Sequence, residues 1–587
     1  MAQRNHRLID GKIAKYMLPS IMMNMAMQLG NIVDTMLVGN LLGTKAMSAI
    51  MLCMPVALLE QVVGFGLGTG AAIAAATFLG KRDKKSASDI FSTVFWLTVI
   101  FGALFVLAAF FLCDPVAHLL SGGGEFEGLA RDYMFIWMLG CPVIGIGLYL
   151  MNFMGVESQP RLSSAYIIVS NVINLVLDYI FLAYTPLGIK GAALSTVIGY
   201  LGGMAVYIKY IRMKGKMLSL RPVIALSSAA AALKSGFPTL IYMGMKLVQS
   251  LGLNFIIKGL LGEEGFTIYT VCSNVMMIML MVTGGIIGVI PNLAGVLYGE
   301  KDYYGLRSVA LRTLKTAGIV TAGLLIGIMI FAGQVAGLFG VNEESLLGFT
   351  VPAMRCFMLC LPFFVWNKFL TSYYQCIGET RFASLITLLE NGTIILPAAY
   401  ISISFALSAD SSGFIAMGLS FVISEGLTAA VSLVIGFIKH PKNPVFILPG
   451  TNTGECLDLS IPADKEEVPA LVRRMLEFAV ENGVERTLAN RMTVAAEEMT
   501  ENIIAYGGKS SEWIDLCLTI EPEVLRMRIR DNGIPFDPTS YEFDGDLFDI
   551  SGIGIVKRLA SDINYVRSID LNNTVIEVGR NAITEEH

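Results

Sequence analysis

A carboxylate and an amide lie within a hydrophobic stretch that has the pattern of a helix. The stretch runs from Ser170 to Phe181 and carries Asn174 and Asp178 four residues apart, so both side chains share one helix face. An ionisable group inside a membrane span costs about 2.5 kcal/mol or more at the bilayer centre and is a functional-site hypothesis by default. Asn174 and Asp178 are therefore candidates for binding a cation.

Two further polar side chains fall at a similar depth. At a rise of ~1.5 Å per residue, Asp34 lies late in a first helix, Asn174 and Asp178 past the middle of a fifth, and Thr196 early in an oppositely directed sixth. Two carboxylates, an amide and a hydroxyl at one level can coordinate Na+ or share a proton. Simpler interpretations remain: Asp34 as an interfacial residue, and Asn174 as an interhelical hydrogen-bonding group.

The composition indicates a membrane domain followed by a soluble one. Of the 587 residues 54% are hydrophobic and only 15% are charged, whereas soluble domains carry about 25% charged residues. Many of the charges lie after residue 440, where no apolar run approaches the ~18 residues needed to span a bilayer. The net charge of -5 averages two unlike parts, and we expect no nucleic-acid partner. No cleavable signal peptide is visible, and the nine scattered cysteines read as reduced, small hydrophobic residues.

Twelve apolar runs are long enough to span a membrane. They fall at 16–40, 46–79, 88–113, 127–153, 161–184, 190–211, 235–260, 265–298, 308–334, 347–375, 382–407 and 413–438. Lys and Arg collect in one set of alternate loops, for example Lys81 to Lys85 and Lys209 to Arg221, and at both ends of the helical part. By the positive-inside rule, both termini and the soluble tail are cytoplasmic, in a multi-pass protein of the plasma membrane.

An internal repeat divides the membrane part into two halves. Gly80-Lys81-Arg82-Asp83 recurs as Gly299-Glu300-Lys301-Asp302, and Pro160-Arg161 recurs as Thr380-Arg381, at spacings of 219 and 220 residues. Two six-helix halves in the same orientation are a known transporter plan. The predicted units are 10–225, 226–440, a linker 441–454 and a tail domain 455–583. Ala398 stands where the first half has Asp178, so the predicted ion chemistry belongs to the N-terminal half.

Other polar residues within the spans are weaker candidates. Glu60 and Glu390 are the two acids that we would place on a substrate path. Lys246, Arg355, Lys368 and Glu425 read instead as snorkelling or paired side chains. The glycines at alternate positions from Gly64 to Gly70 predict close helix packing or a bend.

The membrane part resembles the multidrug and toxic compound extrusion (MATE) family. The resemblance rests on Asn31-Ile32-Val33-Asp34-Thr35, on the glycine run Gly64 to Gly70 and on Asn174 to Asp178, in this order. It implies an all-α fold of twelve helices in two lobes, and export of small organic, often cationic compounds against Na+ or H+. The family's ion site would correspond here to Asp34, Asn174, Asp178 and Thr196. A lipid-linked oligosaccharide flippase of related architecture is an alternative.

The tail shows alternating strand-like and helical patterns. Three different motifs follow one another along it. A helix from Leu488 to Tyr506 places Glu498 and Asn502 on one face, and a strand from Val524 to Arg530 leads into Asp531-Asn532-Gly533. Gly552-Ile553-Gly554 then opens a further helix. Each motif alone is common in turns and helix starts, so only their order and spacing are specific.

The tail resembles the GHKL-type ATP-binding α/β sandwich, nearest to its anti-sigma-factor serine kinase branch. The resemblance implies that Asn502 binds Mg2+, Asp531 binds adenine beside Gly533, and Gly552 and Gly554 bind phosphates of ATP. Glu498 would be the general base, or else an exposed helix carboxylate. The phosphate-lid pattern is short, and no phosphoacceptor His helix precedes the domain, which argues against a histidine kinase.

Together these patterns predict a cation-coupled exporter with an ATP-binding, kinase-like regulatory tail. The alternative from the enzyme class is a membrane-tethered serine kinase or sensor. Its helices would serve as a receptor, and its tail would phosphorylate a serine of an anti-anti-sigma-type protein.

Overall fold

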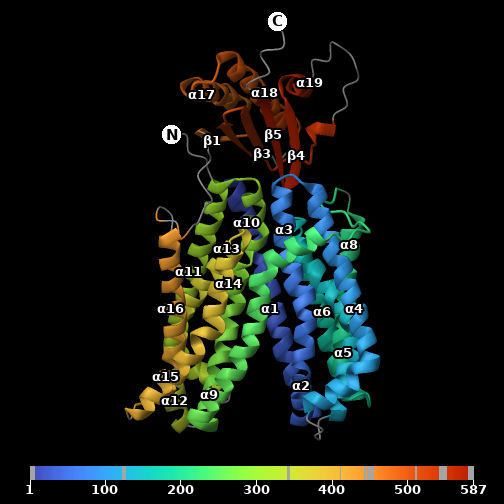
Figure 1. Cartoon of the computed structure of the whole chain (residues 1–587), viewed down its shortest axis with the longest axis vertical. Coiled ribbons are helices and arrows are strands. Elements are labelled where there is room, and N and C mark those ends of the chain that lie inside the picture. Colours follow the sequence, from blue (N-terminus) through green and yellow to red (C-terminus); the bar gives the residue numbers. More distant parts are fainter. Residues whose placement is uncertain are drawn as a thin grey trace.

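The computed structural model describes residues 7–121, 127–213, 215–339, 341, 344–409, 411–439, 441, 445, 455–508, 512–540 and 552–579. Long helices form the larger part of the molecule, and a small domain of helices and strands lies at one end of them (Figure 1). Most of the predicted linker 441–454 and residues 580–583 of the predicted tail domain lie outside the described residues.

The first half of the helical part is built from long apolar helices. They are α1 (Arg7–Leu42), α2 (Thr44–Gln61), the π-helix η1 (Val62–Leu67), α3 (Gly68–Gly80), α4 (Lys84–Ser121), α5 (Glu127–Val156), α6 (Pro160–Tyr184), α7 (Ile189–Gly203), the 3-10 turn η2 (Met204–Val206) and α8 (Tyr207–Arg212). We call α1 to α8 the N-terminal half.

The second half repeats this plan. It consists of α9 (Leu226–Ile287), α10 (Val289–Gly299), α11 (Tyr303–Leu338), α12 (Glu344–Met358), α13 (Leu361–Cys376), α14 (Thr380–Leu388), the π-helix η3 (Leu389–Thr393), α15 (Ile395–Ser408) and α16 (Gly413–Lys439). We call α9 to α16 the C-terminal half. Among the described residues, ten helices are long and apolar enough to cross a membrane.

One of these ten helices corresponds to two predicted spans. Helices α9 and α10 together form a helical stretch of 74 residues, Leu226–Gly299, and the backbone of α9 breaks at Gly262, where φ is 67°. That break falls between the predicted spans 235–260 and 265–298, at a residue without a Cβ that adopts positive φ at little cost. The membrane-spanning character of the helical part is confirmed, while the count of twelve spans and the two lobes stay predictions.

The internal repeat has a backbone counterpart. Arg82 and Lys301 both adopt left-handed φ angles, of 64° and 56°, and Ser158 and Gly378 do so at 60° and 83°. Side-chain-bearing residues rarely take this conformation. Its recurrence at spacings of 219 and 220 residues supports the duplication inferred from the two Gly-x-x-Asp loops.

Glycines bring the two halves together near the tail. A Cβ at Gly80 would lie 2.9 Å from the Cα of Gly299 on α10, and one at Gly70 would lie 2.5 Å from the Cα of Gly236 on α9. Gly64 lies in η1, a π-helix, with its Cβ position 3.0 Å from the Cα of Gly145. The predicted close packing of the glycine run is confirmed.

The tail is a five-stranded antiparallel sheet with helices on one face. Its elements are β1 (Glu455–Pro462), the 3-10 turn η4 (Lys465–Glu467), α17 (Val468–Glu481), α18 (Arg486–Tyr506), β2 (Trp513–Ile520), β3 (Val524–Asp531), the 3-10 turn η5 (Pro538–Ser540), α19 (Gly552–Leu559), β4 (Asp562–Ser568) and β5 (Leu571–Gly579). The strand order is β1-β2-β3-β5-β4.

The two faces of this sheet differ because side chains alternate along a strand. Leu516, Met527 and Ile576 belong to the apolar cluster shared with α17 and α18. The opposite face carries polar side chains, including Arg526, Arg528 and Arg530 at alternate positions of β3. It points toward the ends of the membrane helices (Figure 1).

The glycine contact beside the tail generates a prediction about stability. Gly80→Val places a branched side chain against the backbone of α10, and such overpacking costs about 1–3 kcal/mol. We expect a lower Tm of the purified protein in detergent. The matched control is Gly318→Val on α11, where no atom of another described segment lies within 4 Å of the added Cβ. Equal melting of the two variants would contradict the close contact.

Candidate functional site

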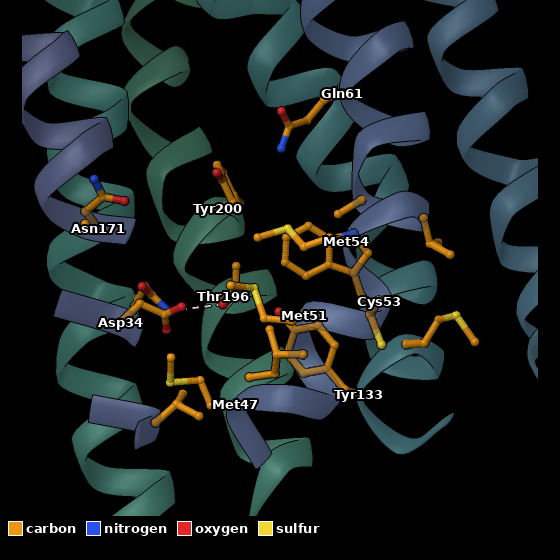
Figure 2. A pocket seen from close by; sticks show the side chains of 18 of the residues that line it. Asp34, Met47, Met51, Cys53, Met54, Gln61, Tyr133, Asn171, Thr196 and Tyr200 are labelled. Atoms are coloured by element: carbon orange, nitrogen blue, oxygen red, sulfur yellow. Dashed lines mark hydrogen bonds between the residues drawn. The ribbon is translucent and has the colours of Figure 1, made fainter. Parts of the chain in front are cut away.

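A cavity of about 250 Å³ lies inside the N-terminal half and contains three of the four predicted ion-site residues in its lining. Asp34 comes from α1, Asn174 from α6 and Thr196 from α7. Figure 2 shows Asp34 and Asn171 on one side of the cavity, with Met51, Met54 and Tyr133 on the other. The cavity therefore has a polar wall and an apolar wall.

The polar wall is a connected set of hydrogen bonds. Asn174 Nδ2 donates to Asp178 Oδ2 at 3.0 Å and to Thr196 Oγ1 at 3.2 Å. Asp178 is fully buried and also accepts a hydrogen bond from Ser195. Asp34 lies within hydrogen-bonding reach of Asp178. The structure thus brings all four predicted residues together, while ion binding itself stays a prediction.

Sequence reasoning missed Ser195. This residue directly precedes Thr196, so the signal was a pair of adjacent hydroxyls on α7 facing a helix with a carboxylate. Adjacent helical residues point about 100° apart, since a turn holds 3.6 residues. The rotation of α7 decides which of the two hydroxyls reaches Asp178, and hydropathy does not report that rotation.

The approach of α1 to α6 positions the two carboxylates. Asn171 Nδ2 donates to the carbonyl oxygen of Ala26 at 2.6 Å. A Cβ at Gly30 would lie 2.6 Å from the same amide nitrogen, so only glycine leaves room there. Asp34 follows Gly30 by one helical turn and Asp178 follows Asn171 by two. Close contact at Gly30 and Asn171 therefore brings the acids together.

The C-terminal half carries a separate cluster of paired charges. Lys368 Nζ lies 3.3 Å from Glu390 Oε1 and 3.8 Å from the centre of the Tyr242 ring. Asn367 Nδ2 donates to Glu425 Oε2 at 2.8 Å. The interpretation of Lys368 and Glu425 as paired side chains is confirmed, and Glu390, placed on a substrate path by the sequence, lies in this cluster within η3.

Glu60, the other acid that the sequence placed on a substrate path, is nearly fully buried at the end of α2. Its carboxylate oxygens have no hydrogen-bond partner among the described residues. Glu60 does not line the cavity that holds Asp34.

In the tail, α18 and α19 bring three predicted residues into contact. A Cβ at Gly552 would lie 3.0 Å from Asn502 Nδ2 and would also touch Glu498 Oε2. Asn502 Nδ2 has no hydrogen-bond partner among the described residues. Burial raises the pKa of Glu498, and the neighbouring Glu501 and Glu497 raise it further. A carboxylate with a raised pKa is suited to accepting a proton.

Asp531 lies at the end of β3 in a second group of predicted residues. Its Oδ1 accepts from the Gly533 amide at 2.7 Å and from Asn572 Nδ2 at 2.9 Å. Burial raises the pKa of Asp531, and the hydrogen bond from Asn572 opposes that rise. A Cβ at Gly533 would lie 3.0 Å from the Cα of Gly507, so the absent side chain makes room for the end of α18.

These residues fit a bound Mg-nucleotide. Asp531 is a buried acceptor, Asn502 offers amide atoms, and Gly552 leaves space beside Glu498 that a Cβ would fill. Gly554 lies in the first turn of α19 and is buried. The predicted phosphate lid and Ser551 lie outside the described residues. Sequence reasoning missed Asn572, whose signal was the Asn572-Asn573 pair in the last strand.

Comparisons with known proteins give results for both parts of the chain. The family model MatE matches residues 19–180 and 238–401, and a model described as a histidine kinase-like ATPase domain matches residues 461–578. The multidrug export protein MepA of Staphylococcus saprophyticus is 23% identical over 419 residues, which cover 70% of this chain and 90% of that protein. MepA of Staphylococcus aureus strain MRSA252 is 21% identical over 431 residues, covering 73% and 93%.

Solved structures agree with the fold of the helical part. A structure described as the outward-facing conformation of a multidrug resistance MATE family transporter of the MOP superfamily has a TM-score of 0.68. It is 21% identical and covers 75% of this chain and 98% of its own. A MOP superfamily transporter from Pyrococcus furiosus has a TM-score of 0.66 at 21% identity, covering 73% and 95%.

The surroundings of Asp531 generate a prediction about nucleotide affinity. Asp531 Oδ1 already accepts from both Gly533 N and Asn572 Nδ2. In Asp531→Asn that oxygen is kept, while an amide nitrogen replaces the other oxygen, so the acceptor and the charge that an adenine amino group would meet are lost. Hydrogen bonds to charged groups contribute about 1.5–3 kcal/mol, so we expect ATP affinity to fall at least about tenfold. The measurement is calorimetric titration of the full chain in detergent. The control is Asp537→Asn, a half-buried residue whose carboxylate accepts from Thr539, and equal affinities in the two variants would contradict the assignment.

Proposed function

This chain belongs to the MatE family, and from that premise we propose that it exports small organic compounds across the membrane in exchange for Na+ or H+. The observation that carries the proposal is the group of Asp34, Asn174 and Thr196 at one wall of the cavity, with Asp178 buried behind them and hydrogen-bonded to Asn174. Relatives named multidrug export proteins, each aligned over most of its own length, support it.

The two carboxylates supply a physical link between ion binding and helix position. Two ionised carboxylates within hydrogen-bonding reach repel each other unless a proton or cation lies between them. Asp34 belongs to α1 and Asp178 to α6, so loading or releasing the ion changes the force between these helices. Ser195 and Asn174 keep Asp178 in place throughout, because both are hydrogen-bonded to it.

The apolar wall indicates the chemistry of the substrate. Met47, Met51 and Met54 line the cavity together with Tyr133 and Trp137. Methionine side chains adapt to varied apolar shapes, and aromatic faces attract cations. An organic cation with an apolar body suits this wall, and the carboxylates opposite attract its charge. Substrate and coupling ion then compete for the same charge, as an exchanger requires.

The tail is an ATP-binding regulatory domain in this proposal. Asn502 would hold Mg2+, Asp531 would accept from the adenine amino group, and Gly552 and Gly554 would face the phosphates. The fit of Gly552 beside Glu498 and Asn502 supports this. Basic residues of the helix ends, such as Lys12 and Lys15, lie beside the tail, which supports a cytoplasmic location for the tail and both termini.

A second candidate activity is serine phosphorylation by the tail. Glu498 favours it, because this carboxylate adjoins Asn502 and Gly552 and its pKa is raised by burial. In that reaction the phosphoryl group moves from ATP to the serine oxygen of a protein partner, Glu498 takes the hydroxyl proton, and ADP leaves. An anti-anti-sigma-type protein is the partner class that the tail's fold suggests.

The test of export is flux in proteoliposomes. We expect efflux of a cationic dye under an imposed H+ or Na+ gradient. Asp34→Asn and Asp178→Asn should each reduce it at least about tenfold, because a neutral amide cannot exchange a proton or balance a cation. The control is Asp114→Asn, a carboxylate of an exposed ion pair with Arg131. Normal flux in both Asp34→Asn and Asp178→Asn would refute the ion site, and no gradient-driven flux in the wild type would refute export.

A further inference from the structure

The polar face of the tail sheet contacts the loop between α10 and α11 in the C-terminal half. Arg530 is 1% exposed; its guanidinium donates to Asp302 Oδ2 at 2.8 Å and also to Glu300. Arg528 lies 3.5 Å from Asp302. Ser568 of β4 donates to Glu300 Oε1 at 2.7 Å. These contacts place a fully buried ion-pair network at the boundary between tail and membrane part.

The turn between β4 and β5 contacts the N-terminal half. Lys15 of α1 donates to Asp570 Oδ2 at 2.7 Å, and Lys12 donates to the Asp570 carbonyl oxygen at 2.9 Å. Burial alone would raise the pKa of Asp570, but hydrogen bonds from Lys15 and Arg567 and the charge of Lys12 hold it below its usual range. Asp570 is therefore ionised and joins the tail to α1.

The tip of this turn is held in an unfavourable backbone conformation. Ile569 has a φ of 47°, a left-handed value that a β-branched residue adopts only under strain. Its side chain is 1% exposed and lies in the same apolar cluster as Leu8, Ile9 and Ile13 of α1. The strained tip thus inserts among the helix ends, at the place where β4 and β5 meet them in Figure 1.

The residues that contact the membrane part are linked to the candidate nucleotide site. Arg567 donates to Asp570 Oδ1 at 2.8 Å, to Asn572 Oδ1 at 2.8 Å and to the Gly533 carbonyl at 3.1 Å. Asn572 in turn donates to Asp531. Arg530 is the chain neighbour of Asp531. A change at Asp531 is therefore transmitted to Asp570 and α1 through Asn572 and Arg567. It is transmitted to Arg530 and the α10–α11 loop through the backbone of β3.

We propose that the tail is a clamp that ties α1 of the N-terminal half to the α10–α11 loop of the C-terminal half. Nucleotide binding at the tail changes the strength of these two contacts. The inference rests on the proposed function, since an alternating-access exporter must separate its halves on this side. The halves touch here at Gly80 and Gly299. A clamp across this contact stabilises the state that is closed toward the tail and slows transport.

The clamp is tested by distance measurements on the full chain. Spin labels on unnatural amino acids at positions 85 of α4 and 315 of α11 report the separation of the halves in nanodiscs. Asp570→Asn and Arg530→Gln should raise the open fraction about tenfold, because each removes charge-assisted hydrogen bonds. Arg473→Gln, an exposed residue of α17, is the control. Unchanged distances in both variants would overturn the clamp, whether or not the protein transports.

Flux provides the second readout of the same variants. We expect Mg-ATP to alter wild-type flux, and Asn502→Ala to abolish that response. Asp570→Asn should transport faster and respond less to Mg-ATP while still binding the nucleotide. Wild-type flux and response in Asp570→Asn would overturn the clamp and leave export intact. Absence of all gradient-driven flux would refute export, and the distance measurement would still decide the clamp. Arg530→Gln leaves two acids buried, so Asp570→Asn is the variant that retains the fold.

A different observation carries a second inference. Cys456 of β1 and Cys517 of β2 have their Sγ atoms 3.1 Å apart, and a carboxylate oxygen of Asp458 lies within 4.8 Å of both. The antiparallel register pairs Asp458 with Cys517 and places Cys456 on the same sheet face. All three line a cavity of about 280 Å³ beneath the polar face, beside the loops at Lys81 and Glu300.

The geometry points to a binding site for a thiophilic divalent cation such as Zn2+, with Cys456, Cys517 and Asp458 as ligands and water from the cavity completing the set. Zn2+ accepts two thiolates, a carboxylate and a water in tetrahedral coordination. The hydrogen bond between the two thiols lowers the pKa of Cys456, whereas the same hydrogen bond and burial raise the pKa of Cys517. A bound metal ion would displace both thiol protons. Neighbouring strands hold the three donors at fixed spacing.

Cobalt substitution tests this site in the reduced full chain. We expect one Co2+ per chain with the near-ultraviolet absorption of thiolate ligation, displaced by Zn2+ and lost in Cys456→Ser and in Cys517→Ser. Cys356→Ser on α12 is the control. Absence of that absorption in the wild type, or its persistence in Cys517→Ser, would overturn the site. If the reduced protein, once exposed to air, forms a Cys456–Cys517 disulfide with O2 as the oxidant even in the presence of Co2+, the metal site is likewise overturned.

Discussion

The cost of taking a charge out of water governs the arrangement of this molecule. A buried ion is tolerated when its partners replace the lost hydration and becomes strongly destabilising when a partner is missing. Asp178 has Asn174 and Ser195, Lys368 has Glu390, and Arg530 has Glu300 and Asp302. Each set joins different helices or domains. The buried charges therefore fix which elements lie next to each other in the membrane part and at its junction with the tail.

The candidate ion site could be predicted from the sequence because helices have regular geometry. A fixed rise per residue sets the depth of Asp34, Asn174, Asp178 and Thr196 once the spans are placed. The rotation of each helix about its axis is not set in this way, and so Ser195 escaped prediction. The approach of α1 to α6 depends on Gly30, because a Cβ there would clash with the side chain of Asn171. A lone glycine in a helix has many uses, and the sequence does not show which one applies.

The tail illustrates where sequence patterns become ambiguous. Alternating polar residues in β3 predict one polar sheet face, and such faces usually point to solvent. The burial of Arg530 requires the acidic loop of the C-terminal half, which is remote in sequence. Gly533 is a similar case. A Cβ at this position would clash with Gly507, which is remote in sequence at the end of α18. Motif order identified the nucleotide-binding fold, while these contacts depend on packing between separate elements.

The difference between the two repeated loops explains why the tail binds in one orientation. The N-terminal copy reads Gly80-Lys81-Arg82-Asp83 and the C-terminal copy Gly299-Glu300-Lys301-Asp302, and the third residue of each copy has a left-handed φ. The first copy carries two cations and the second only one. A strand presenting three arginines is repelled by the first and attracted by Glu300 and Asp302 in the second. Asp570 has the opposite charge and is attracted to Lys12 and Lys15 on α1 of the N-terminal half. Two contacts of opposite polarity, one on each half, leave a single orientation in which both are satisfied, and in that orientation the strands carrying Asp531 and Asn572 bridge the two halves.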